Sequence, residues 1–119
     1  MITLVLDSNK EYMPYYALST PDSRLIKDND EVVGLIDYRV YDLYVEIMYI
    51  TVRPSCRKKN YATKVINIIK NLYKDKEIRG CSLPGVAMKF WESLGAEFDN
   101  SNNNYLTPFC IKKDAIAAS

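Results

Sequence analysis

Residues 52–63 read Val-Arg-Pro-Ser-Cys-Arg-Lys-Lys-Asn-Tyr-Ala-Thr. They follow an almost continuous apolar run, residues 43–52, which predicts a strand that is covered on both faces and central in its sheet. They lead into residues 60–76, where apolar side chains recur at the i, i+3, i+4 spacing of an amphipathic helix. Because Pro54 cannot donate to a β ladder, it ends the strand. The stretch therefore predicts a strand, a loop and a helix in direct succession.

Three consecutive cations, Arg57, Lys58 and Lys59, fall at or just before the predicted start of this helix. The helix dipole already places about half a positive charge there, so each cation is unfavourable by up to about 1 kcal/mol. Free N–H groups at a helix start, together with local cations, form a binding site for phosphate. The charges alone leave two explanations open, a solvated basic loop and an anion site.

The chain has the size and composition of one globular domain. Its 119 residues suffice for a single core, and a net charge of +1 argues against a general nucleic-acid or membrane-surface binder. We expect residues 1–113 to form the domain and residues 114–119 to be a disordered tail. The absence of histidine excludes Ser–His and Cys–His nucleophiles and most zinc sites, so we expect no metal centre.

The sequence favours a reduced, cytoplasmic setting. The N-terminal apolar run stops at Asp7, too early for a secretory leader. No segment approaches the ~18 consecutive apolar residues of a membrane span. Cys56, Cys81 and Cys110 are odd in number, widely spaced and without a C-x-x-C pair, which is typical of free thiols.

The remaining pattern predicts an α/β layer arrangement with a mixed sheet. A second helix is predicted over residues 85–94, with Gly95 suited to the left-handed position that ends it. Leu72 and Val86 are expected on the apolar stripes of the two main helices, and residues 9–20 can hold one short helix around Pro14. The other predicted strands, including a closing hairpin, are residues 2–6, 24–27, 31–41, 78–83, 97–99 and 105–112.

Residues 52–66 resemble motif A of the GNAT acetyltransferase superfamily. The family pattern is Arg/Gln-x-x-Gly-x-Gly/Ala after a strand and a Val-x-Pro segment; this chain has Arg57-x-x-Asn60-x-Ala62 after Val-Arg-Pro. The resemblance implies that the loop amides hold the pyrophosphate of coenzyme A. Asn60 stands where glycine is usual. Asparagine is the next most tolerant residue for a positive φ, so we expect the loop to keep its shape.

Residues 86–96 look like the family's motif B, Ala-x-x-(Phe/Leu)-Tyr-x-x-x-Gly-Phe, with Trp91 where tyrosine is usual and Pro84 where asparagine often stands. Gly34 also fits the family's third strand. Together these features cover about residues 31–99. They imply a small single-domain GNAT fold, with a mixed, mostly antiparallel central sheet flanked by helices and a shortened N-terminal helical region.

Glu46 is the one carboxylate inside the apolar run 43–52, and burying a charge is costly without a partner or a purpose. An edge-exposed or salt-bridged glutamate would explain it without a function. By resemblance, it stands where some lysine-acetylating members have their general base. An acceptor amine of pKa ~10.4 must lose a proton before it attacks a thioester. A glutamate whose pKa rises on burial could take that proton.

The resemblance implies an acetyl-CoA-dependent N-acetyltransferase that acts on a primary amine by direct attack on the thioester. The backbone amides of residues 50–52 would pair with pantetheine, and one of them would stabilise the oxyanion. The implied cofactor-binding residues are Ile50, Thr51, Val52, Arg57, Lys58, Lys59, Asn60, Tyr61, Ala62, Thr63 and Trp91.

The leaving thiolate has no obvious proton donor. Family members often use the tyrosine that Trp91 replaces; an indole N–H is not a usable acid, and we expect Trp91 to form an apolar wall for pantetheine. Tyr105, in the predicted last strand, is the substitute candidate. Cys81 could be a nucleophile, but a buried structural thiol is the simpler expectation.

Two other functions stay open. Asn60, Pro84 and Trp91 favour a catalytically weak or inactive GNAT-like module that binds acyl-CoA or a protein. A small RNA- or DNA-binding domain using Arg53 and residues 57–59 is more distant, because the charge is near neutral and no second basic stripe is visible. The amine acceptor, a small molecule or a protein, would be met by an open surface, by a partner protein or by a second copy of this chain. The tyrosines expected on the acceptor side are Tyr12, Tyr15 and Tyr16.

Overall fold

The computed structural model describes residues 1–6, 23–101 and 105–113. Two predictions lie outside the described residues: the short helix within residues 9–20 and the tail 114–119. The acceptor-side residues Tyr12, Tyr15 and Tyr16 also lie outside them.

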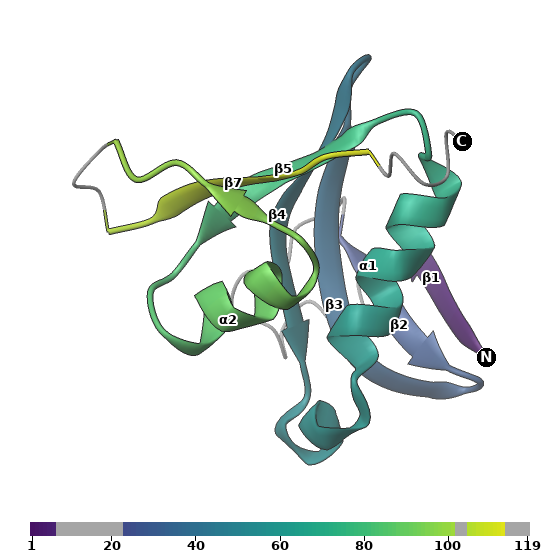
Figure 1. Cartoon of the computed structure of the whole chain (residues 1–119). Helices are drawn as coiled ribbons and strands as arrows, with labels where there is room; N and C mark the ends of the chain where they lie inside the picture. Colours follow the sequence, from purple (N-terminus) through teal and green to yellow (C-terminus); the bar gives the residue numbers. More distant parts are fainter. Residues whose placement is uncertain (7–22, 102–104, 114–119) are drawn as a thin grey trace. The chain divides into compact units, whose positions relative to one another are not determined.

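The described chain is built from seven strands, two α-helices and one 3₁₀ helix, η2. The elements are β1 (Ile2–Leu6), β2 (Arg24–Asp28), β3 (Glu31–Val40), β4 (Tyr44–Val52), η2 (Pro54–Lys59), α1 (Tyr61–Leu72), β5 (Glu77–Ser82), α2 (Val86–Ser93), β6 (Glu97–Phe98) and β7 (Thr107–Ile111). The strands belong to one sheet in the order β1-β2-β3-β4-β5-β7-β6 (Figure 1). The pairs β1–β2, β2–β3, β5–β7 and β6–β7 are antiparallel, and β4–β5 is parallel. The predicted mixed, mostly antiparallel sheet with β4 at its centre is confirmed.

The chain divides into two compact parts. The first comprises residues 1–38 and 48–68, and therefore holds β1, β2, most of β3, the end of β4, η2 and the start of α1. The second comprises residues 39–47 and 69–119, and holds the start of β4 together with β5, α2, β6 and β7.

The core of the first part comes from β2, β3 and the start of α1. Between β2 and β3 the register shifts at Ile26 and Lys27, where the ladder has an irregularity. The predicted apolar face of α1 is buried where it begins, and this packing fixes the position of the helix start. Leu25, Val32 and Leu35 form one cluster, against which Tyr49 packs. The other buried apolar side chains of this part are Ile26, Val33, Ile36, Tyr38, Cys56, Tyr61, Val65 and Ile66.

The core of the second part lies on one face of the β4–β5–β7–β6 strands. Trp91 of α2 stacks on Phe109 of β7, with ring centroids 4.3 Å apart. The predicted closing hairpin is confirmed, because Glu97 and Phe98 pair with residues of β7. Gly95 has a φ of 88°, the left-handed conformation expected after α2. The buried apolar side chains are Val45, Ile47, Ile69, Ile78, Trp91, Phe109 and Ile111.

The predicted end of the main helix was wrong. It ends at Leu72 rather than at residue 76, and Leu72 is 62% exposed. The backbone N–H of Lys76 donates to Tyr73 O, a tighter turn than the helical i to i−4 bond. The Lys76 ammonium also donates to the carbonyls of Tyr41 and Asp42, at 2.7 and 2.8 Å. These long-range bonds draw the chain out of the helix and into β5.

Three expectations about burial and strand ends were also wrong. Val86, expected on the apolar stripe of α2, is 83% exposed at the first turn of that helix. In β4, Val45 and Ile47 are buried but Met48 is 51% exposed, so this central strand is not covered on both faces. Tyr105 precedes β7 instead of lying in it. None of the helices in the described part of the chain is long and apolar enough to cross a membrane.

Candidate functional site

The candidate anion site is built around Asn60, between η2 and α1. Its φ of 58° and ψ of 29° are left-handed, as expected for a residue that replaces glycine in the motif. The Lys64 N–H donates to Asn60 O at 3.1 Å. In an α-helix the first amides have no intrahelical acceptor, so those of residues 61–63 point out of the helix start. The first turn of α1 contains no acidic residue.

Two arginines attach this loop to the neighbouring strands. The Arg57 Nε donates to Val52 O at 3.0 Å, which folds η2 back on the end of β4. The Arg53 N–H donates to Val33 O at 2.8 Å, and its Nη1 donates to Val32 O at 3.2 Å. Both arginines therefore have a structural role as well as a charge. Lys59 is exposed.

Gly34 lets β4 pass close to β3. A Cβ at residue 34 would overlap the carbonyl oxygen of Thr51 and would lie 3.1 Å from the Cα of Val52. Only glycine leaves room for this approach. The candidate pantetheine-binding residues Ile50, Thr51 and Val52 are half-buried at this end of β4. The parallel ladder with β5 ends earlier, at the pair formed by Ile47 and Gly80.

Tyr61 anchors the start of α1 by its side chain. Its ring is buried, and its hydroxyl donates to Asp28 Oδ2 at 2.6 Å. The hydrogen bond to the Asp28 carboxylate, with burial as the second cause, raises the pKa of Tyr61 to about 12. The same hydrogen bond, followed by the N-terminal ammonium, lowers the pKa of Asp28. Because the hydroxyl is bound to Asp28 and the ring is buried, Tyr61 can contact a ligand at this site only through its backbone N–H.

Glu46 lies on the polar face of the second part. It is half-buried, and its register partner on β5 is Arg79. Within the described residues no hydrogen bond or ion pair engages its carboxylate. The salt-bridged alternative for this residue is therefore not observed among those residues.

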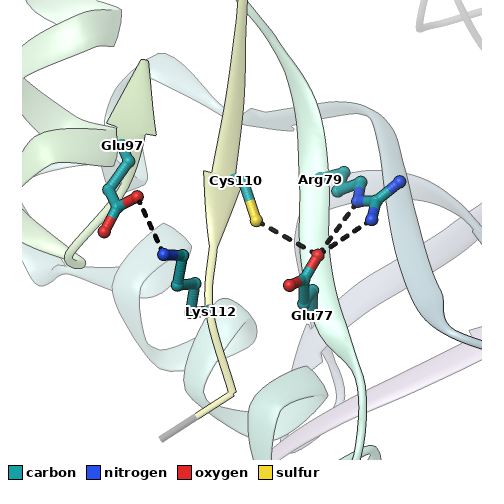
Figure 2. Close-up of polar contacts among 5 residues, drawn as sticks. All are labelled: Glu77, Arg79, Glu97, Cys110 and Lys112. Atoms are coloured by element: carbon teal, nitrogen blue, oxygen red, sulfur yellow. Dashed lines mark hydrogen bonds and ion pairs between the residues drawn. The ribbon is translucent and has the colours of Figure 1, made fainter. Parts of the chain in front are cut away.

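A network of polar contacts surrounds Glu77 on the same strands (Figure 2). Its Oε2 accepts from Arg79 Nε and Nη2, at 3.1 and 2.9 Å, and from Cys110 Sγ at 3.4 Å. The Arg79 hydrogen bond, and next that of Cys110, lowers the pKa of Glu77. Burial, and next the contact with Glu77, raises the pKa of the Cys110 thiol, so this thiol stays protonated. On β6, Glu97 forms an ion pair of 3.5 Å with Lys112.

The remaining candidates have different surroundings. Trp91 is buried against Phe109 and Phe90, which makes it part of a core. Tyr105 is 74% exposed. Cys81, expected to be a buried structural thiol, is exposed near the end of β5. The structure therefore groups residues 50–63 in the first part and Glu46, Trp91 and Tyr105 in the second.

A basic cavity of about 80 Å³ in the second part escaped the sequence analysis. Lys70 lies in the last turn of α1, where the helix dipole favours a positive charge. Lys76 and Lys112 already contact main-chain carbonyls and Glu97 respectively. No sequence signal joined these positions, because two of the lysines follow β7 and the others end α1 or precede β5. The lining lysines are Lys70, Lys74, Lys76, Lys112 and Lys113.

Residues 5–96 match the family model described as acetyltransferase (GNAT) family, which is more than half of the chain. An uncharacterized N-acetyltransferase in the lysA 3′ region of Bacillus methanolicus is 34% identical to this chain over 55 residues. That match covers 45% of this chain and 46% of the relative, so this chain spans about half the length of the curated relative that it matches.

Several solved structures have a similar fold. An acetyltransferase from Thermus thermophilus superposes with a TM-score of 0.73 at 12% identity, covering 92% of this chain and 96% of that one. Naa50 of Arabidopsis thaliana, in complex with the bisubstrate analogue CoA-Ac-MVNAL, gives 0.69 at 17% identity with the same coverage. PaiA N-acetyltransferase of Thermoplasma acidophilum, in complex with coenzyme A, gives 0.63 at 15% identity, covering 76% of this chain and 59% of that one. At these identities the likeness establishes the fold.

Proposed function

This chain belongs to the acetyltransferase (GNAT) family, and from that premise we propose that it transfers an acetyl group from acetyl-CoA to a primary amine. The segment from η2 to the first turn of α1 binds the coenzyme A pyrophosphate. The end of β4, residues 50–52, pairs its backbone amides with the pantetheine arm. Glu46 accepts the proton of the amine.

The observation that carries the proposal is the left-handed Asn60 between η2 and α1. It sets the N–H groups of residues 61–63 at a helix start, where the dipole adds about half a positive charge. Arg57 and Lys59 add positive potential at the surface of the same loop. A diphosphate has the charge and the acceptor oxygens that such donors need. Relatives solved with coenzyme A or a coenzyme A analogue support the choice of this anion.

We propose the other cofactor-binding roles from the resemblance to the family. Ala62 and Thr63 act through their backbone amides, as does Tyr61, whose hydroxyl is bound to Asp28. Lys58 belongs to the same basic run. Trp91 is a wall residue rather than a proton donor.

Acetyl-CoA supplies the acetyl group as a thioester when it is bound. An amine of pKa ~10.4 is protonated at neutral pH, and Glu46 takes its proton directly or through a water molecule. No hydrogen bond or ion pair within the described residues engages the half-buried Glu46 carboxylate. Tyr105 is the proposed donor to the leaving thiolate, and a thiol of pKa ~8.5 can also leave as the anion.

The first experiment measures thermal melting with acetyl-CoA, with ATP and NAD as comparison ligands. Ligand at 100 times its dissociation constant is expected to add about 2.7 kcal/mol of stability. The double variant Arg57→Gln/Lys59→Gln is expected to lose most of this shift. Lys74→Gln/Lys89→Gln, which changes two exposed lysines outside the loop, is the matched charge control and should keep it. No shift with millimolar acetyl-CoA would contradict every function that uses coenzyme A.

A second candidate function is an acyl-CoA-binding module with little or no catalysis. The buried, stacked Trp91 favours it, because that position offers no acid for the leaving group. Thiol release with spermidine, lysine methyl ester and a peptide with a free N-terminus separates the two functions. We expect turnover by the wild type and a loss of about 10²–10⁴ in Glu46→Gln. Binding without turnover of any amine would favour the module.

A further inference from the structure

The polar face of the second part carries a row of polar side chains beside Glu46. In the parallel β4–β5 ladder, Glu46 pairs with Arg79 and Tyr44 pairs with Glu77. Register partners point to the same face of a sheet, and the intervening residue Val45 is buried on the opposite face. Glu46 and Arg79 are therefore neighbours on the polar face, as are Tyr44 and Glu77.

Arg79 nevertheless turns away from Glu46. No ion pair links the two residues in the part of the chain that the structure describes. The guanidinium donates twice to Glu77 Oε2 (Figure 2). It also lies 4.3 Å from the ring centroid of Tyr44. The Cys110 thiol donates to the same carboxylate oxygen, at 3.4 Å. The Arg79 guanidinium is thus held beside the pair formed by Tyr44 and Glu77, which lies two residues before Glu46 on β4 and two residues before Arg79 on β5.

We propose that Glu77 and Tyr44 are positioning residues that hold Arg79 away from Glu46 and so leave the Glu46 carboxylate available to accept the proton of the amine. The inference rests on the proposed role of Glu46 in acetyl transfer. A guanidinium within 4–6 Å of a carboxylate lowers the carboxyl pKa by about 1–3 units. A carboxylate paired in this way is a poor acceptor for the proton of an amine. Because Arg79 is bound to Glu77 and Tyr44, it does not lower the proton affinity of the Glu46 carboxylate, although it remains on the neighbouring strand.

Other groups also face Glu46. The β3–β4 hairpin closes with the Tyr41 N–H donating to Tyr44 O at 2.8 Å. Two residues further along each strand from the pair formed by Tyr41 and Tyr44, antiparallel pairing would place Arg39 of β3 opposite Glu46 of β4. Arg39 already takes part in another interaction. Cys81 is the next residue of β5 on the same face. A guanidinium released from β5 would therefore place the carboxylate between two arginines.

The test measures the ionisation of Glu46 itself, which needs no acceptor amine. The carboxyl carbon shifts of ¹³C-labelled glutamates are followed with pH, and the Glu46 signal is assigned by its loss in Glu46→Gln. Glu77→Gln keeps the side-chain shape, releases Arg79, and is expected to lower the Glu46 pKa by about one unit or more. The double variant Glu77→Gln/Arg79→Gln should bring it back to the wild-type value. The acid limb of the turnover profile should move in the same direction.

Glu97→Gln is the matched control. Glu97 has the same charge on the same sheet and an ion pair of its own, but β5 and β7 separate it from β4. It should leave the Glu46 pKa unchanged. The double variant serves alone if Glu77→Gln does not fold, because it removes one charge of each sign. It should keep the wild-type Glu46 pKa, and a rise of about one unit or more would overturn the proposal, because it would show that Arg79 already acts on Glu46.

The outcomes separate the two proposals. An unchanged Glu46 pKa in folded Glu77→Gln overturns the positioning role, and the acetyl transfer proposal stands if turnover still depends on Glu46. Equal turnover by Glu46→Gln and the wild type removes Glu46 as the base, whatever its titration shows.

Discussion

A methyl group at residue 34 is expected to weaken both the fold and acetyl-CoA binding. The added Cβ would overlap Thr51 O and would lie 3.1 Å from Val52 Cα, so the nearest atoms are backbone and one strand must shift. Overpacking of this kind costs about 1–3 kcal/mol. Replacing glycine also restricts the unfolded chain, which offsets about 0.4–1 kcal/mol. We therefore expect Gly34→Ala to lose about 1–2 kcal/mol of unfolding free energy, measured by urea denaturation.

The effect on binding follows from the same shift. Displacing the amides of residues 50–52 by enough to lose one hydrogen bond costs about 0.5–1.5 kcal/mol. The dissociation constant of acetyl-CoA, measured by calorimetry, should rise about two- to tenfold. Gly95→Ala is the control: its φ of 88° is left-handed, with open space around it among the described residues. It should cost about 1–2 kcal/mol with unchanged affinity. Wild-type stability and affinity in Gly34→Ala would refute the close approach of the two strands.

Three further variants test the anion loop and its supports. Asn60→Ala should lose about 1–2 kcal/mol in urea unfolding, since its φ of 58° is left-handed, whereas Asn60→Gly should lose none; equal losses would argue against this conformation. Tyr61 has a pKa of about 12 in the fold against an ordinary 10.0, so its contribution to stability is complete below pH 10 and is lost as the pH rises towards 12. The stability advantage of the wild type over Tyr61→Phe should therefore shrink across that interval, and a constant difference would contradict the bond to Asp28. Ile66→Ala removes a side chain with 0% exposure and should cost about 2–5 kcal/mol in a denaturant titration, against little change in the exposed Lys64→Ala.

The parts of the fold that were predictable depend on local pattern. The start of α1 was readable because Pro54 ends the strand and the apolar spacing begins at Ala62. The left-handed Asn60 was readable because only glycine, asparagine and a few others tolerate that backbone. The end of α1 was not, since the bonds of Lys76 to the carbonyls of Tyr41 and Asp42 join distant parts of the sequence.

The parts of the site that were not predictable depend on strand register. Glu77, Arg79 and Cys110 carry no spacing signal, and their contacts exist only once β5 and β7 pair with Arg79 opposite Cys110. A one-residue slip would send these side chains to the other face of the sheet. Glu46 was identified from the sequence because it is the one carboxylate in an apolar run. Its neighbours on the adjacent strands could not be predicted from the sequence.

The three thiols differ in their exposure to solvent, so one of them can be labelled selectively. Cys81 is exposed, Cys56 is buried, and Cys110 is partly buried with a raised pKa. Because the thiolate is the reactive form, a maleimide or disulfide reagent should label Cys81 first and leave a single probe at the end of β5. The same thiol will consume reagent in any assay that follows coenzyme A release by its sulfhydryl. A Cys81→Ser background removes that stoichiometric signal and leaves the coenzyme A thiol as the main species counted.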